Sequence, residues 1–292
     1  MLASQPDFPA IPVPFDASAE ALELLTRQLR FKLVQMSHAA GTPHLASALS
    51  CVEILVTAYW KVLRIDPAKP ADPGRDRFIL SKGHAASILY ATLAARGFFP
   101  PALLDGFGQP GSPLAEQPAP GCAPGVELAT GSLGHGLPVG IGMALAAGIQ
   151  QQDYRVLVTM SDGECNEGSV WEAAMFAPAQ QLAKLAVIVD YNKWQATGRS
   201  NEVMALAPLH KKWEAFGWST CEVDGHDLNA LTQVMSRIPD GSGKPVAIIA
   251  HTVKGKGISF MEGRSEWHNK LPNAEQMATA RAELGLAELG LA

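Results

Sequence analysis

Three short, largely apolar runs constrain the fold of this chain more than any other feature of its sequence. They span residues 155–160, 185–189 and 246–250. Runs without polar alternation are typical of strands that helices cover on both faces of a sheet. Helical patterns separate the runs, at 171–182 and 227–237. Strands alternating with helices predict an α/β fold with a doubly wound, mostly parallel sheet and helices on both faces.

The chain upstream of these runs also has clear signals for regular elements. An apolar stripe with helical spacing follows Asp16, a candidate N-cap. Residues 50–53 have the form of a capping box at the start of a second helix. Residues 77–80 are a strand candidate that leads into a helix ending at Gly97. The stretch 97–125 is so rich in Gly and Pro that it predicts a long loop, which in a compact domain is usually functional or disordered.

The remaining segments complete the predicted organisation. Residues 126–128 predict a brief strand, and a Gly-rich turn then leads to a helix of small residues over 138–150. Residues 1–15 are rich in proline and predict an extended arm. Because no internal repeat or low-complexity linker divides the rest, we expect residues 16–292 to form one domain.

Composition and charge exclude several classes of protein. Of the 292 residues, 47% are hydrophobic and 17% are charged, so the chain can bury a large core and is neither disordered nor fibrous. Its 23 basic and 28 acidic side chains give a net charge of −5, which argues against a nucleic-acid partner. The longest uncharged stretch, 128–152, is broken by polar residues and glycines, so we expect no membrane span.

The cysteines and the start of the chain indicate the compartment. No basic residue precedes Arg27, and no apolar segment is followed by a small-residue cleavage site, so we expect no secretion. The four cysteines lie far apart without paired CxxC spacing, at Cys51, Cys122, Cys165 and Cys221. They are typical of free thiols, and we therefore predict a cytoplasmic protein.

Polar residues follow two of the apolar runs directly, where an α/β sheet binds ligands. Asp162 and Gly163 come after the first run, and Asn192 comes after the second. If the two strands are neighbours, the carboxylate and the amide oxygen meet at one point and suit Mg²⁺ better than Ca²⁺, with a phosphate as further ligand. Taken singly, Asp162 would cap a helix and Asn192 would make a turn. Neither a GxGxxG nor a Walker-type pattern occurs.

Several segments together resemble transketolases, specifically the amino-terminal half that binds the diphosphate of thiamine diphosphate. The thiamine-diphosphate motif is matched by residues 162–163, 167–168, 171–173 and 190–192. Residues 78–86 match a segment that bears a histidine, and residues 124–127 with 130–134 match the loop that contacts the pyrimidine. Residues 252–257 with 266–268 match the last histidine-bearing segment. The matches keep the family order from about residue 35 to 275, and they imply a thiamine-diphosphate-binding fold.

The resemblance also implies which residues bind the cofactor and its metal ion. Asp162, Asn192 and the backbone carbonyl of Trp194 would bind Mg²⁺, or another divalent cation such as Ca²⁺ or Mn²⁺. Gly163 would contact the diphosphate, and Glu167 would also contact the cofactor. The aminopyrimidine would be contacted through the backbone of two loop residues, Gly131 and Leu133.

Histidines are the implied catalytic groups, because proton transfer at sugar hydroxyls needs side chains that titrate near neutrality. His84 and His268 would lie at the diphosphate and the reaction centre, and His44 would face the acceptor sugar. Gln117 stands where the family has a donor-binding histidine. Either the donor therefore differs from the usual ketose phosphate, or the match in this loop is misplaced. We expect ordinary structural roles for four other histidines: His38, His210, His226 and His251.

Two further departures from the family pattern are small. Ser161 replaces the first glycine of Gly-Asp-Gly, and His135 replaces a glutamine after the loop glycine. More consequentially, the pyrimidine-binding domain of the relatives has no room after His268, where only 24 residues remain (292 − 268).

The resemblance therefore implies one subunit of a split, α₂β₂ transketolase-like enzyme with sugar phosphate substrates. It would transfer a two-carbon ketol unit from a ketose to an aldose only with a separate C-terminal, pyrimidine-domain subunit. Two alternatives remain. The chain could be half of a deoxyxylulose-phosphate-synthase-like or 2-oxo acid dehydrogenase-like enzyme, or it could be a non-catalytic subunit with the same fold.

Overall fold

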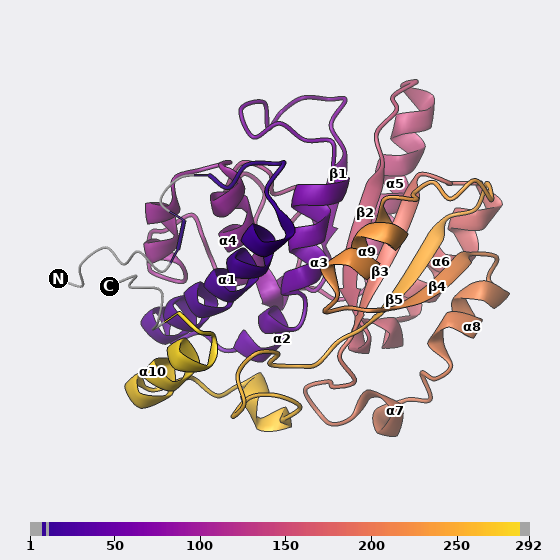
Figure 1. Ribbon diagram of the computed structural model, residues 1–292. Helices are drawn as coiled ribbons and strands as arrows, with labels where there is room; N and C mark the ends of the chain where they lie inside the picture. The colour runs from indigo at the N-terminus through magenta and orange to yellow at the C-terminus, as the bar shows by residue number, and fades with distance from the viewer. Residues whose placement is uncertain (1–7, 10–11, 287–292) are drawn as a thin grey trace.

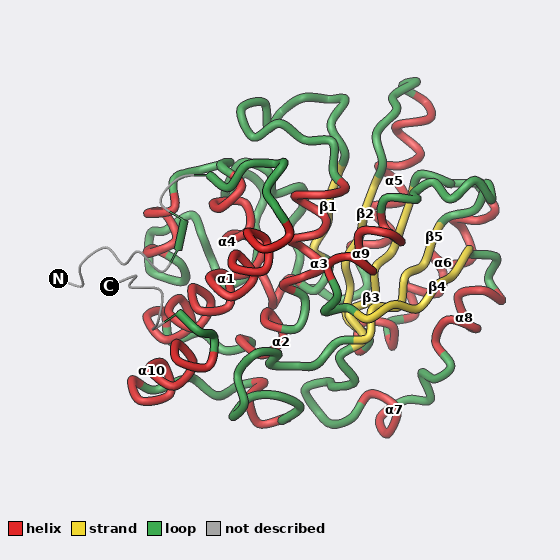
Figure 2. The backbone as a smooth tube through the Cα atoms, in the orientation of Figure 1, coloured by secondary structure: helices red, strands yellow, loops and turns green. Residues whose placement is uncertain are grey.

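The core of the chain is a five-stranded, wholly parallel sheet in the order β1-β2-β3-β5-β4. The computed structural model describes residues 8–9 and 12–286, so the predicted arm over 1–15 lies partly outside the described residues. The strands are β1 (Arg77–Leu80), β2 (Val156–Ser161), β3 (Leu185–Tyr191), β4 (Ser219–Asp224) and β5 (Val246–His251). The predicted α/β class and parallel sheet are confirmed (Figure 2).

Helices cover both faces of this sheet (Figure 1). The α-helices are α1 (Ala19–Ala40), α2 (Leu45–Leu49), α3 (Val52–Thr57), α4 (Ala86–Arg96), α5 (Gly136–Ile149), α6 (Gly168–Ala179), α7 (Ser200–Val203), α8 (Leu209–Ala215), α9 (Leu228–Met235) and α10 (Ala274–Glu283). Shorter turns of 3₁₀ or π helix lie at Ala58–Val62, Gly83–Ala85, Pro101–Gly106, Gly163–Asn166 and Ser265–His268.

Alternate strand residues point into two separate apolar cores, as the two-residue period of a strand requires. In β1, Phe78 packs into the core beneath α1, α3, α4 and α9, whereas its neighbour Ile79 packs into the core beneath α5, α6 and α8. In β3, Ile188 and Val189 divide in the same way. The central strands are therefore mostly apolar on both faces, which is why their runs are visible in the sequence.

The helix ends confirm some local predictions and correct others. Gly97 ends α4 in the left-handed conformation, with φ of 96°, as predicted. Helix α1 begins after Ser18 instead of Asp16, because the Ser18 hydroxyl accepts a hydrogen bond from the backbone N–H of Ala21 at 3.2 Å. The predicted capping box at 50–53 is wrong: Cys51 precedes α3 without a side-chain cap, and Glu53 pairs with a buried arginine instead.

Two strand predictions also need correction. Residues 126–128 form no strand, and Glu127 instead forms an ion pair with Arg75. Strand β4 was not predicted, because most of its side chains are at least partly exposed, whereas those of the other edge strand, β1, are mostly buried. Its residues alternate in polarity and so lack a continuous apolar run, which is expected at the edge of a sheet.

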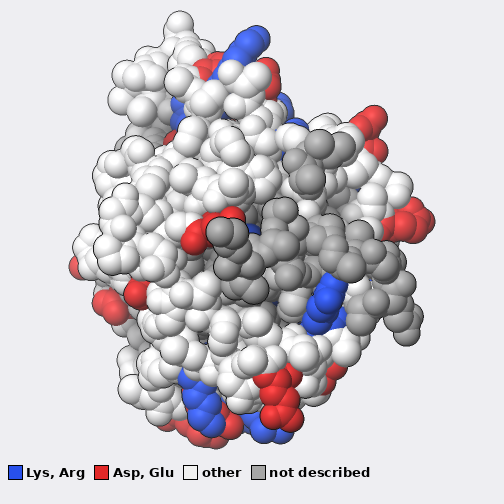
Figure 3. All heavy atoms as spheres, turned by 90° about the vertical axis from the view of Figure 1, so that its left-hand side faces the viewer, with Lys and Arg blue, Asp and Glu red and all other residues white. Residues whose placement is uncertain are grey.

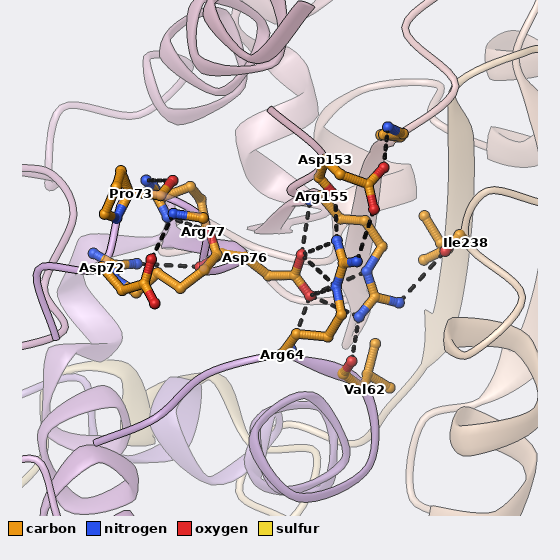
Figure 4. Close-up of polar contacts among 12 residues, drawn as sticks. Val62, Arg64, Asp72, Pro73, Asp76, Arg77, Asp153, Arg155 and Ile238 are labelled. Atoms are coloured by element: carbon orange, nitrogen blue, oxygen red, sulfur yellow. Dashed lines mark hydrogen bonds and ion pairs between the residues drawn. The ribbon is translucent and has the colours of Figure 1, made fainter. Parts of the chain in front are cut away.

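A buried carboxylate ties the starts of β1 and β2 together (Figure 4). Asp76 lies between Arg64 and Arg155, whose guanidinium groups approach its oxygens at 2.9 and 2.7 Å. The backbone N–H groups of both arginines donate to the same carboxylate, each at 2.8 Å. Asp153 binds Arg64 from the solvent side. This cluster lies at the amino ends of the strands, away from the edge where the predicted site residues lie.

Candidate functional site

The predicted convergence of two strand ends is observed. Strands β2 and β3 are parallel neighbours, with Ser161 opposite Asp190. Asp162 therefore lies beside the backbone that leaves β3, and its Oδ2 accepts hydrogen bonds from the N–H of Lys193 at 2.9 Å and from the hydroxyl of Ser200 at 2.8 Å. Its Oδ1 accepts from the N–H of Gly163 at 2.9 Å.

Asp162 is a buried carboxylate without a basic partner. It has no exposed surface, and no ion pair among the described residues includes it. Burial raises its pKa to about 6, and the negative charge of Asp190 adds to the shift, although the hydrogen bond from Ser200 opposes it. A buried charge of this kind is costly unless a cation or further hydrogen bonds offset it. The position therefore favours a bound cation.

Asn192 offers an amide oxygen next to this carboxylate. Its Oδ1 accepts from the N–H of Trp194 at 3.1 Å, which leaves one lone pair for a ligand. Among the residues that the structure describes, no three His, Cys, Asp or Glu side chains gather in a metal-binding geometry. A metal ion would therefore draw on one carboxylate, one amide and backbone or ligand oxygens, which is a set that suits Mg²⁺. The residues present fit the predicted ion.

Three predicted histidines form a compact cluster beside this site. The ring centroid of His44 lies 5.4 Å from that of His84 and 4.9 Å from that of His268, and the latter two rings are 6.3 Å apart. They come from three distant segments: the residue before α2, the turn Gly83–Ala85 and the turn Ser265–His268. The backbone N–H of His44 donates to the carbonyl of His268 at 3.0 Å, which fixes two of these segments together.

The cluster is held in its neutral form. Burial, followed by the charge of Lys82, lowers the pKa of His84 well below its ordinary value. Burial and the charge of Lys254 lower the pKa of His268 to about 4, and burial also lowers that of His44. A neutral imidazole has one donor and one acceptor nitrogen. At neutral pH the three rings can therefore each accept one hydrogen bond and donate another.

The structure also brings Gln117 to the predicted pyrimidine loop. Gly131 has φ of 137°, and a Cβ at this position would overlap the carboxamide of Gln117. The side chain therefore packs directly over the loop glycine. Leu133 is half-buried in the same loop, whereas Glu167 is exposed before α6 and lies against Gly134. The individual cofactor contacts of these residues stay predictions.

Sequence reasoning missed four buried charged residues around the site. Lys82 and Asp190 form an ion pair without exposed surface, and Glu164 accepts hydrogen bonds from Ser81 and from the N–H of Gly134. Lys254 contacts Nδ1 of His268 at 3.0 Å, and burial, with the charge of Lys82, lowers its pKa to about 8. For Lys82 and Asp190 the available signal was a charged residue just beyond an apolar run, since such residues are rarely buried without a partner. Glu164 and Lys254 lie in segments without such a run.

The histidines to which we gave structural roles lie outside the cluster. His38 contacts the carbonyl of Pro272 at 2.7 Å. His210 and His251 both contact Glu222 near the surface, at 3.3 and 3.1 Å. The fourth, His226, contacts Glu53 and the N–H of Val253. None of these contacts involves the predicted site residues.

Comparison with known proteins agrees with this geometry. A model of the family described as "Transketolase, thiamine diphosphate binding domain" matches residues 22–289. The chain is 42% identical over 265 residues to one subunit of the apulose-4-phosphate transketolase of Phocaeicola vulgatus, covering 91% of this chain and 94% of that protein. It is 41% identical to the 6-deoxy-6-sulfo-D-fructose transketolase subunit SqwG of a Clostridium species, covering 84% and 89% respectively.

A solved structure gives the same answer for the fold. The transketolase of Campylobacter jejuni superposes with a TM-score of 0.86 at 27% identity, covering 92% of this chain and 43% of that one. The fold and the polar cluster at the strand ends thus define a thiamine-diphosphate-binding domain. The chain belongs to the transketolase family.

These findings decide between the alternatives left open by the sequence. Transketolases are transferases, and the similar proteins that are named as transketolase subunits support that assignment over the synthase-like, dehydrogenase-like and non-catalytic alternatives. The chain spans about two fifths of the length of the solved transketolases that it matches. None of the helices in the described part of the chain combines the length and apolar character needed to cross a membrane.

Proposed function

We propose that this chain is the cofactor-binding subunit of a split transketolase, which transfers a two-carbon ketol unit from a ketose phosphate to an aldose. The observation that carries the proposal is the buried carboxylate of Asp162, which lacks a basic partner and lies beside Asn192 at the ends of two parallel strands. Thiamine diphosphate, when bound, supplies the electron sink for breaking and forming the carbon–carbon bond. Mg²⁺, or Ca²⁺ or Mn²⁺ in its place, would link its diphosphate to the protein.

The residues around this position divide the work. Asp162, Asn192 and the carbonyl of Trp194 hold the metal ion, and Gly163 and Glu167 contact the cofactor on its diphosphate side. Gly131 and Leu133 contact the pyrimidine through their backbone, as the family resemblance implies. The close packing of Gly83, which precedes His84, against Gly131 of the loop supports this division.

The histidine cluster binds and orients the sugars. Lys254 donates to Nδ1 of His268, so the neutral ring carries its own hydrogen on Nε2 and can donate a hydrogen bond to a substrate oxygen. His84 and His44 are also neutral, so each has a nitrogen that can accept a hydrogen bond from a hydroxyl of the donor or the acceptor sugar. Gln117 can hydrogen-bond a donor hydroxyl but cannot exchange a proton with it.

A second subunit would complete the active site. The naming of its relatives as subunits supports a separate partner chain, which we take to be the pyrimidine-domain subunit of an α₂β₂ assembly. An apolar surface of α5 and α6 is available for it: Val139, Ile149, Met175 and Phe176 are exposed, Ile149 by 83%. Helix α5 carries no charged residue and begins just after the predicted pyrimidine loop over 130–134.

The other side of the molecule has a different character. Figure 3, which views the molecule from the side of α1 and α10, shows basic and acidic side chains scattered in small groups. No continuous patch of one sign is visible on the described part of that face. We therefore place the partner on the α5 and α6 surface. The four cysteines are free, which supports a location in the reducing cytoplasm.

Reconstitution tests the split arrangement. The chain alone, with Mg²⁺ and thiamine diphosphate, should show negligible ketol transfer, and addition of the pyrimidine-domain subunit should restore it with ketose phosphates but not with pyruvate. Robust turnover by the single chain would refute the split arrangement. Ile149→Glu should weaken assembly in analytical ultracentrifugation, because it places a charge in an apolar interface, whereas Lys211→Glu on exposed α8 is the control.

Substitution of the proposed metal ligand tests the cofactor site itself. Asp162→Ala should abolish metal-dependent binding of thiamine diphosphate in the assembled enzyme, measured by isothermal titration calorimetry. The substitution removes a buried charge without a basic partner but leaves three donors without their acceptor, so thermal unfolding of the variant is measured beside it. An unchanged cofactor affinity would show that the metal site is placed wrongly.

A further inference from the structure

Asp190 is the most heavily hydrogen-bonded carboxylate near the site, and the proposed mechanism does not use it. The side chain lies in β3, two residues before Asn192, and has no exposed surface. Four side chains donate to it: Ser50, Lys82 and Asn192 to Oδ2, and Thr252 to Oδ1. Such a complete set of donors indicates that the position of this carboxylate is fixed.

One of these donors is the amide of a proposed metal ligand. Nδ2 of Asn192 donates to Oδ2 of Asp190 at 3.3 Å and lies 3.4 Å from the hydroxyl oxygen of Ser50. A flipped amide would instead turn Oδ1 towards the carboxylate and Nδ2 towards the N–H of Trp194. Both of these contacts would be repulsive, because they oppose two acceptors and two donors. The carboxylate therefore permits only one orientation of the amide.

In this orientation the free lone pair of the amide oxygen faces the same loop as Asp162. Oδ1 of Asn192 accepts a hydrogen bond from the N–H of Trp194, and Oδ2 of Asp162 accepts one from the N–H of the preceding residue, Lys193. Because the two oxygens accept from neighbouring residues of one loop, we infer that they serve the same ion. Rotating the amide would replace one of them by an NH₂ group, which cannot coordinate a cation.

Lys82 holds the carboxylate in place and compensates its charge. Its ammonium group donates to Asp190 and, at 2.7 Å, to the carbonyl of Ser47 in α2. The charge of Lys82 lowers the pKa of Asp190, although burial opposes this shift. Because α2 begins directly after His44, the same lysine connects the histidine cluster with the end of β3.

We propose that Asp190, held by Lys82, is a positioning residue that fixes the Asn192 carboxamide with its oxygen directed to the metal ion. The inference rests on the proposed function, since it concerns the same metal site. Partners that orient metal ligands typically contribute about 10–100-fold to metal affinity. Asp190 and Lys82 would act on the ion only through the amide, without touching it.

Two double variants separate this role from a general effect on folding. Lys82→Met with Asp190→Leu removes the ion pair and also the acceptor for the amide. Lys82→Met with Asp190→Asn removes the same charges, but a side chain of nearly the same shape keeps one acceptor oxygen. Buried ion pairs can be replaced by apolar residues of similar volume without loss of stability. If leucine does not fit, Asp190→Ala with Lys82→Met removes the acceptor with a smaller side chain.

The measurement is the affinity of the assembled enzyme for Mn²⁺ in the presence of thiamine diphosphate, followed by the electron paramagnetic resonance signal of free Mn²⁺. We expect the leucine variant to bind about 10–100-fold more weakly than the unmodified enzyme. The asparagine variant should bind nearly as well as the unmodified enzyme. Thermal unfolding of both variants reports their folding independently.

The outcomes distinguish this inference from the proposed function. Equal Mn²⁺ affinities of the two double variants, with tight binding by the unmodified enzyme, would overturn the positioning role alone. Absence of cofactor-dependent Mn²⁺ binding in the unmodified enzyme would overturn the proposed function, and the positioning role with it. A weakened leucine variant beside an intact asparagine variant supports both.

Discussion

Gly83 packs so closely against the predicted pyrimidine loop that one methyl group added at Gly83 should displace the loop. A Cβ at this position would lie 2.5 Å from the backbone nitrogen of Gly131 and 2.6 Å from Oγ1 of Thr130, whereas ordinary contacts begin near 3.4 Å. Gly83→Ala therefore requires the loop to move by about 1 Å, because the obstructing atoms are mostly backbone. Overpacking of this kind typically costs about 1–3 kcal/mol of stability.

The functional loss should exceed the loss of stability. Displacing a positioning loop by about 1 Å can lower a rate about 100-fold. We therefore expect Gly83→Ala to weaken thiamine diphosphate binding and to lower ketol transfer by the assembled enzyme, measured by calorimetry and a coupled assay. Gly74→Ala is the control, since Gly74 lies in an exposed loop outside the proposed subunit interface, where a Cβ meets only the side chains of Asp72 at 3.3 Å and Gln152 at 3.9 Å. A Gly83→Ala enzyme with unchanged cofactor affinity would refute the packing argument.

Two further predictions concern buried charges outside the site. Although burial raises the pKa of Glu53, the charge of Arg30 and the hydrogen bond from His226 outweigh it and lower the pKa to about 2, from an ordinary value of 4.5. This carboxylate should therefore contribute about 3 kcal/mol to the free energy of unfolding above pH 4.5, and this contribution should be lost as the pH falls towards 2. In urea unfolding across this range, the stability of Glu53→Gln should depend less on pH than that of the unmodified chain. Asp76→Ala should lower the free energy of unfolding by about 3–5 kcal/mol, because it leaves the buried guanidinium group of Arg155 without its partner. An unfolding temperature close to that of the unmodified chain would contradict this.

The sequence predicted the centre of the sheet because burial on both faces leaves a continuous apolar run. Strands β2, β3 and β5 have such runs and were located within two residues of their ends. Edge strand β4 has no such run, since its residues are mostly half-exposed, and it was missed. Local signals were less reliable. Residues 50–53 have the form of a capping box, but a tertiary contact between Glu53 and Arg30 takes the side chain that the box requires.

For the site, the sequence predicted residues at strand ends and in family motifs, but not the buried side chains that orient them. Asp162 and Asn192 could be paired because adjacent parallel strands must end side by side. Asp190 directly follows an apolar run, and nothing in its neighbourhood indicates that three distant segments donate to it. Its partners Ser50, Lys82 and Thr252 are far apart in the chain. Only the register of the sheet and the packing of α2 and α3 on it bring them together.

This difference explains why the cofactor was predictable while the supporting network was not. Groups that bind a phosphate and a metal ion must follow strands, so their positions are readable from the order of elements. Groups that orient those ligands can come from any segment that packs nearby, and their spacing in the sequence carries no information. A buried lysine such as Lys82 is the exception, because its charge requires a partner. A charged residue just beyond an apolar run, as Lys82 is, is therefore the best sequence signal for the residues that orient a site.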